Sequence, residues 1–164
     1  PNTAMVAKTK KFCLVLHNLR GAHNVGAIFR LADAIGAEKI FLTGYTPRPI
    51  DRYGRINKKV AKTALGAERL VAWSGLTRLG SLFPTLRRDG YQLVALEQSA
   101  RSVDYKKFRP TERAALIIGN ELRGVDPAIL KQCDTIVEIP MRGGKESLNV
   151  VVATAVALFR WFDR

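Results

Sequence analysis

Short runs of apolar residues that end in glycine, proline or a polar residue recur along the chain. Apolar runs of this length, without polar alternation, are typical of parallel strands that are buried on both faces. The pattern predicts five such strands, at residues 12–17, 39–43, 91–96, 114–118 and 135–139.

The segment between the first two strands has apolar side chains at helical intervals of three and four, which predicts a helix over residues 23–37 with one buried stripe. Arg30 lies roughly 200° around this helix from Ile28, so it points away from the stripe. Gly26 precedes Arg30 by one turn, and its missing side chain allows another backbone or a ligand to approach. The stripe consists of Val25, Ile28, Ala32 and Ile35.

The last helical segment differs from the first, because residues 150–162 are apolar on nearly every face. A helix of this kind is buried either in the core or against a partner subunit. Shorter helices are predicted at residues 58–67 and 75–89, the second with a break near Pro84.

The order of these elements predicts the fold class. A strand, a helix and a second strand open the chain, which implies a parallel pair with a right-handed crossover. We therefore predict an α/β fold, an open and mainly parallel sheet with helices on both faces. The length of 164 residues suits one domain, which we place at residues 12–164 after a flexible segment at residues 1–11.

In open α/β sheets, ligands bind outside the carboxyl ends of the strands. Three of the predicted strands end in polar or glycine-rich loops, at residues 97–99, 119–124 and 140–146. The sequence therefore predicts a pocket between these loops.

Charge adds a second expectation. The chain has 27 basic and 14 acidic side chains, a formal net charge of +13, and the first half, residues 1–82, holds 14 basic and only 4 acidic ones. A surface of this kind attracts polyanions, first of all nucleic acid, although a generically basic protein is the alternative. Anionic membrane is a weaker option, because no basic amphipathic helix is present.

The basic side chains gather in a long segment, residues 44–62, where Tyr45 and Tyr53 lie among them. Cations for phosphates and rings for unstacked bases suit an RNA-binding loop, although a solvated loop is the alternative. The candidate RNA-binding residues are Arg20, Arg48, Arg52, Arg55, Lys58 and Lys59.

Several common sites are excluded. No Gly-x-Gly-x-x-Gly follows the first strand, and the run at residues 143–147 has Glu146 where a phosphate-binding loop needs Ser or Thr. Cys13 and Cys133 lack metal-ligand spacing, and we expect free thiols in a reducing cytoplasm. No apolar run is long enough to span a bilayer.

Three short motifs occur along the chain. Each alone is weak evidence, but their order and separation together are specific enough to indicate a protein family. The motifs are Asn24-x-Gly26-x-x-x-Arg30, then Gly119-x-Glu121-x-x-Gly124, then Ile139-Pro140-Met141 followed by Ser147-Leu148-Asn149-Val150. Together they resemble the SpoU (TrmH-type) family of ribose 2′-O-methyltransferases, in the knotted SPOUT superfamily, over nearly the whole chain.

The resemblance implies a C-terminal trefoil knot, a homodimer with active sites near the interface, and S-adenosylmethionine as the cofactor with no metal. The implied cofactor-binding residues are Leu96, Gly119, Ile139, Met141, Ser147 and Leu148. The implied catalytic residues are Arg30, Asn24, Glu121, Ser147 and Asn149. On the residues alone, Ser147 or Asn149 is equally a helix N-cap.

The family's central catalytic residue corresponds to Arg30. Since an arginine has a pKa above about 12, it is a poor general base, and a bidentate clamp on the neighbouring phosphate suits it better. We expect methylation of a ribose 2′-hydroxyl, with tRNA as the favoured substrate and rRNA as the other option. The alternatives are a SPOUT base methyltransferase and a non-catalytic RNA-binding protein.

Overall fold

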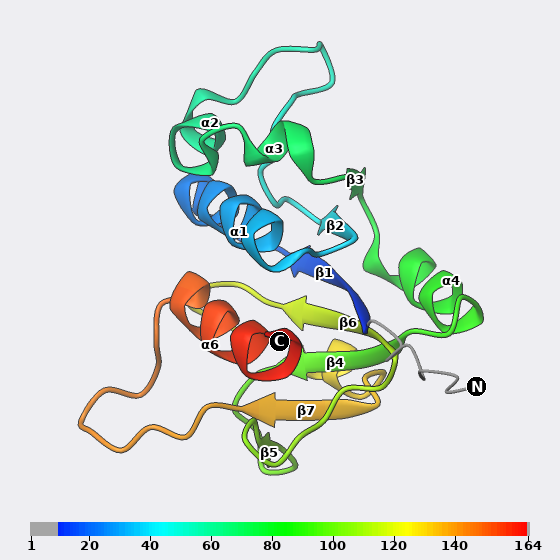
Figure 1. The fold of residues 1–164 in the computed structure, drawn as a ribbon, viewed down its shortest axis with the longest axis vertical. Helices are drawn as coiled ribbons and strands as arrows, with labels where there is room; N and C mark the ends of the chain where they lie inside the picture. The colour runs from blue at the N-terminus through cyan, green and yellow to red at the C-terminus, as the bar shows by residue number, and fades with distance from the viewer. Residues whose placement is uncertain (1–9, 164) are drawn as a thin grey trace, which may run out of the picture.

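The computed structural model describes residues 10–163 of the chain. Its centre is a seven-stranded sheet in the order β3-β2-β1-β6-β4-β7-β5, and every pairing is parallel (Figure 1). The strands are β1 (Lys11–His17), β2 (Lys39–Thr43), β3 (Trp73–Leu76), β4 (Gln92–Leu96), β5 (Val103–Asp104), β6 (Arg113–Ile118) and β7 (Thr135–Glu138). The predicted open parallel sheet is confirmed.

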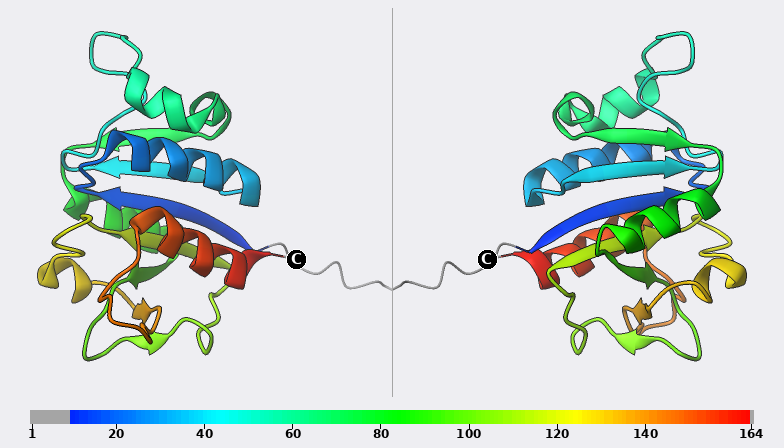
Figure 2. Two further views of the ribbon diagram at one scale, coloured as in Figure 1. Left: turned by 90° about the vertical axis from the view of Figure 1, so that its left-hand side faces the viewer. Right: turned by 90° about the vertical axis from the view of Figure 1, so that its right-hand side faces the viewer.

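Helices cover both faces of this sheet, as predicted. α1 and α6 lie side by side on one face, and α4 and α5 lie on the other (Figure 2). The helices are α1 (Ala22–Ile35), α2 (Lys58–Ala64), α3 (Ala67–Leu70), η1 (Leu79–Ser81), α4 (Leu82–Arg88), α5 (Pro127–Leu130) and α6 (Val150–Phe162). None of these helices is long and apolar enough to cross a bilayer.

Alternating residues of the central strands supply two separate cores. In β1, Phe12, Leu14 and Leu16 face α1 and α6, while Cys13 and Val15 face α4 and α5. A strand that is buried on both faces has no polar positions to alternate with, which is why the sequence shows unbroken apolar runs.

Most boundaries of the predicted elements move by one or two residues, and Lys11 already belongs to β1. The helix predicted at residues 58–67 ends three residues earlier, at Ala64. Lys10 precedes the strand and is exposed, and residues 1–9 of the predicted flexible segment lie outside the described residues.

Two strands were missed, and one predicted helix is wrong in extent. β3 lies where the sequence suggested the start of a helix at residue 75, and β5 lies within a predicted loop. Both are short edge strands whose side chains are exposed or half-buried, so they lack a buried apolar signal. Pro84 does not break α4, because it is the third residue of that helix, where a backbone N–H has no helical partner.

Gly26 is buried where α1 packs against α2, and the predicted close approach is that of another backbone. A Cβ at Gly26 would stand closer than 3.0 Å to the carbonyl oxygen of Val60 and to the hydroxyl of Thr63. The hydroxyl of Thr63 in turn donates to the carbonyl of His23, at 2.8 Å. The glycine thus lets the two helices touch.

We expect Gly26→Ala to destabilise the protein by about 1–3 kcal/mol, because α2 must move away even though alanine favours the helix by about 1 kcal/mol. Urea unfolding measures the loss. Gly80→Ala is the matched control, since a Cβ there meets nothing within 4 Å. Equal stability of the two variants would show that α2 moves away from α1 without a measurable cost in unfolding free energy.

Candidate functional site

The carboxyl ends of β1, β6, β4 and β7 meet at one edge of the sheet, because all four strands are parallel. The loops that follow β4, β6 and β7, together with the start of α6, enclose a hollow of about 190 Å³. This is the place where the sequence predicted a pocket. The hollow is lined by Leu96, Glu97, Gln98, Ile118, Gly119, Asn120, Glu121, Leu122, Gly124, Glu138, Ile139, Met141, Ser147, Leu148, Val150 and Ala153.

All six predicted cofactor-binding residues line this hollow, although they come from three separate loops. The structure therefore brings them together, and their role as ligands stays a prediction. The hollow is also acidic. Its lining includes Glu97, Glu121 and Glu138 and no lysine or arginine, in a chain with a net charge of +13.

The sequence pointed to the end of β4 as a pocket wall but did not single out Glu97. Its carboxylate accepts hydrogen bonds from the backbone N–H groups of Val125 (2.8 Å) and Gln98 (2.7 Å). Gly124 has a φ of +69° and its Cα faces this carboxylate, so a side chain there would displace Glu97. The glycine of the second motif thus makes room for a carboxylate that lies 27 residues earlier in the sequence.

Glu121 ties the loop after β6 to the start of α1. Its carboxylate accepts hydrogen bonds from the backbone N–H groups of Arg20 (2.8 Å) and Gly21 (2.9 Å) and from the side-chain amide of Asn24 (3.2 Å). Partial burial raises the pKa of Glu121, but these hydrogen bonds outweigh burial and the pKa is lowered overall. The carboxylate is ionised at neutral pH and holds the β1–α1 turn in place.

A chain of side-chain contacts continues from Glu121 to α6. The amide of Asn149 donates to the side-chain oxygen of Asn24, at 3.5 Å. Asn149 is also the N-cap of α6, where its side-chain oxygen accepts from the backbone N–H of Val151 at 2.8 Å. The capping interpretation therefore holds for Asn149, while Ser147 lies in the lining of the hollow.

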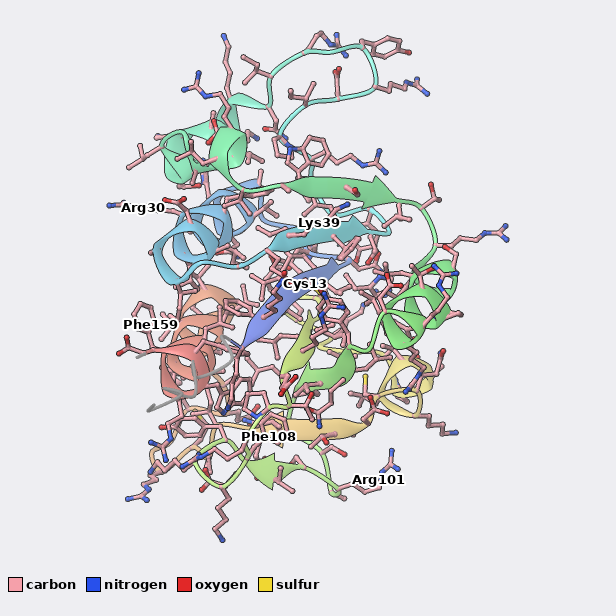
Figure 3. The ribbon with its side chains drawn as sticks, turned by 45° about the vertical axis from the view of Figure 1, so that its right-hand side comes forward. Cys13, Arg30, Lys39, Arg101, Phe108 and Phe159 are labelled. Atoms are coloured by element: carbon pink, nitrogen blue, oxygen red, sulfur yellow. The ribbon has the colours of Figure 1, made fainter. Side chains whose placement is uncertain are left out.

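Of the five predicted catalytic residues, only Glu121 and Ser147 line the hollow. Asn24 and Asn149 are joined to Glu121 by the contacts above. The remaining predicted residue is Arg30. It lies on the exposed side of α1, about 9 Å along the helix axis from Asn24, and it is not among the lining residues. In Figure 3, Arg30 of α1 and Phe159 of α6 lie on the same side of the molecule. The sequence predicted that Arg30 points away from the core, and this is confirmed.

The predicted RNA-binding residues do not form one cluster. Arg52 and Arg55 belong to a hairpin that projects from the sheet (Figure 1), and both guanidinium groups lie near the ring of the exposed Tyr53. Asp51 shapes the hairpin, because it accepts from the backbone of Tyr53 and forms a salt bridge with Arg55 at 2.7 Å. Lys58 and Lys59 follow the hairpin directly at the start of α2, whereas Arg48 packs on Gly75 and Arg20 precedes α1.

Comparison with known proteins identifies relatives along most of the chain. A sequence model of the SpoU rRNA Methylase family matches residues 11–159. The 23S rRNA (guanosine-2′-O-)-methyltransferase RlmB of Ralstonia nicotianae is 37% identical over 147 residues, which is 89% of this chain and 56% of that enzyme. The chain therefore spans little more than half the length of this relative.

Solved structures give the same fold. An AdoMet-bound rRNA methyltransferase from Sinorhizobium meliloti matches 93% of this chain and 56% of its own, with a TM-score of 0.83 and 27% identity. A TrmH/SpoU tRNA modifying enzyme from A. aeolicus matches 93% of this chain and 74% of its own, with a TM-score of 0.79 and 29% identity. The fold matches that of SPOUT methyltransferases, as predicted, and the trefoil knot stays a prediction.

The bonds of Glu121 lead to a pH-dependent stability. A carboxyl whose pKa is lowered by folding stabilises the protein above its unfolded pKa of about 4.3, and this contribution is lost as the pH falls through the folded value. We expect Glu121→Gln to cost about 1 kcal/mol at pH 7, a low figure because the carboxylate is partly exposed.

Urea unfolding of both proteins between pH 7 and pH 3 measures this cost. The difference in unfolding free energy should shrink below about pH 4. A difference that stays constant with pH would mean that the charge of Glu121 does not hold the turn.

Proposed function

The chain belongs to the SpoU methylase family, and on this premise we propose that it transfers a methyl group from S-adenosylmethionine to a ribose 2′-hydroxyl of RNA. The observation that carries the proposal is the acidic hollow at the strand ends, which collects every predicted cofactor-binding residue.

The donor set of the hollow suits this cofactor. Leu96, Ile118, Ile139, Met141 and Leu148 provide apolar walls for the adenine ring and the methionine chain. Three carboxylates in the lining favour a ligand with a sulfonium and an ammonium group, and they disfavour an anion. The bound cofactor supplies an activated methyl group, so the protein has to provide position and charge rather than a covalent intermediate.

Arg30 then acts on the RNA rather than on the cofactor. A guanidinium group binds a phosphate in a bidentate manner and stabilises negative charge that develops on the attacking 2′-oxygen. Asn24, Glu121 and Asn149 fix the start of α1 and of α6 beside the hollow, and Ser147 lies in its wall.

A homodimer completes the proposed site. Val152 and Phe159 of α6 are 49% and 46% exposed, and Phe159 lies on the same side of the molecule as Arg30. If a second copy covers this face, Arg30 lies at the interface, in a site to which both copies contribute. Apolar side chains on a helix next to α1 support this arrangement.

Two classes of RNA are proposed as substrates, whereas one cofactor is proposed. We keep tRNA as the expected substrate, and the resemblance to an enzyme named for guanosine in 23S rRNA makes an rRNA ribose the substrate to test beside it.

A cytoplasmic location is part of the proposal. Supporting it, Cys13 and Cys133 are free thiols rather than a disulfide.

Calorimetric titration of S-adenosylmethionine into the protein tests the cofactor first, and nucleoside mass spectrometry of treated tRNA and rRNA tests the product. Methylated ribose supports the proposal, and a methylated base supports the alternative base methyltransferase. No cofactor binding, with and without RNA, would instead indicate a non-catalytic RNA-binding protein.

Arg30→Ala should lower the turnover of methyl transfer about 10²–10³-fold, because a charge-stabilising group at the reacting oxygen is lost. Cofactor affinity and stability should stay at wild-type values, since Arg30 is exposed and does not line the hollow. Arg88→Ala is the control, an exposed arginine at the end of α4, which leads to the opposite edge of the sheet. Wild-type turnover in Arg30→Ala would remove Arg30 from the mechanism.

Neutralising Arg52, Lys58 and Lys59 to glutamine should weaken RNA binding and reduce its salt slope by about two to three. Arg55 stays in place because its salt bridge shapes the hairpin. The control carries three neutralised residues that belong to neither the hairpin nor α2: Arg88, Lys107 and Lys131. If both triple variants show the same slope, the RNA does not contact the hairpin and α2.

A further inference from the structure

A second hollow adjoins the first at the same edge of the sheet. It has a volume of about 250 Å³ and is lined by Arg20, Tyr45, Asn120, Leu122 and Arg123. Asn120 and Leu122 also line the first hollow, so one ridge of the loop after β6 separates the two. A ligand bound across this ridge would contact both.

The two hollows have opposite charge. The second contains two guanidinium groups and no carboxylate in its lining, whereas the first contains three carboxylates and no cation. Within residues 10–163, neither Arg20 nor Arg123 forms a side-chain hydrogen bond or an ion pair. The nearby carboxylate of Glu121 is occupied by backbone N–H groups and Asn24. Both guanidinium groups are therefore available to an anion.

The backbone beneath these side chains is fixed. The N–H of Arg20 donates to Glu121, and the N–H of Arg123 donates to the side-chain oxygen of Asn120 at 2.9 Å. Asn120 is nearly buried, and its amide donates to the carbonyl of Asn18 at 2.9 Å. The cations thus extend into solvent from anchored positions, an arrangement that reduces the entropy lost when they bind.

Tyr45 adds a ring to the two cations. Its backbone N–H donates to the side chain of Asn18 at 3.2 Å, and its hydroxyl lies 3.2 Å from the amide nitrogen of Asn120, which donates to it. The residue is nevertheless 60% exposed. A ring that is held at both ends and open to solvent is a stacking surface for an unpaired base.

We propose that the second hollow binds the nucleotide of the RNA strand that adjoins the methylated ribose. Arg20 and Arg123 pair with its phosphate, and Tyr45 stacks on its base. The inference rests on the proposed function, since it places this nucleotide across the ridge from the methyl donor. The charge reversal at the ridge then orients the substrate, because a phosphate is repelled by the first hollow and attracted by the second.

The double variant Arg20→Ala and Arg123→Ala tests the two cations. Both substitutions keep the backbone N–H groups that hold the ridge. We expect the KM for RNA and the Kd of RNA without cofactor to rise about tenfold or more, and the salt slope of binding to fall by about one to two. The affinity for S-adenosylmethionine should not change.

The matched control is the double variant Arg88→Ala and Lys131→Ala, which removes the same charge near the amino ends of β4 and β7. Equal Kd values and salt slopes for the two double variants would overturn the inference. The Kd is measured directly, so the inference is tested even if the protein transfers no methyl group. In that case the proposed function fails separately.

The stacking role of Tyr45 has its own test. Tyr45→Phe keeps the ring and loses one hydrogen bond, so it should bind RNA nearly as well as the wild type. Tyr45→Ala removes the ring and should weaken binding about tenfold, the scale of one base stacked on an aromatic side chain. If both variants lose the same affinity, the hydroxyl matters and the ring does not stack.

Discussion

Two neighbouring side chains of one loop, Asn120 and Glu121, hold the functional edge of the sheet together. Parallel pairing aligns Leu16 of β1 with Ile118 of β6, so the loops that follow these strands emerge beside each other. The side-chain amide of Asn120 donates to the carbonyl of Asn18, after β1, and to the hydroxyl of Tyr45, after β2. The carboxylate of Glu121 accepts from the backbone of the turn that starts α1. Without this pair the two hollows would have no common wall.

The ridge built on these bonds also divides charge. A net charge of +13 describes the whole chain, but a ligand within a hollow responds mainly to groups within a Debye length of about 8 Å. Acidic side chains line one hollow and arginines line the other. Under the proposed function, adjacent surfaces would therefore sort a cationic methyl donor from an anionic strand, and the basic hairpin further out would add general attraction to RNA.

The sequence predicted those features that depend on local patterns. Buried central strands require unbroken apolar runs, and Val25, Ile28 and Ala32 of α1 are buried in the structure as their spacing indicated. The short edge strands β3 and β5 were missed because backbone pairing, rather than burial, defines them. Glu97 was not singled out, because its contact with Val125 joins residues 28 apart in sequence. The sequence named Tyr45 by its basic neighbours, but not its contact with Asn120, 75 residues later. No local pattern encodes such contacts.

The position of α1 determines how Arg30 can reach a substrate bound at the two hollows. The hydrogen bonds of Glu121 hold the start of α1, and the contact of Gly26 with α2 holds the next turn. The helix therefore cannot move so as to bring Arg30 to the hollow. A strand bound in the two hollows must then extend to Arg30, or a second copy must present its own Arg30. The second arrangement is the proposed homodimer, in which a partner would cover the exposed Val152 and Phe159 of the adjacent α6. Catalysis and assembly would in that case depend on the same face of the protein.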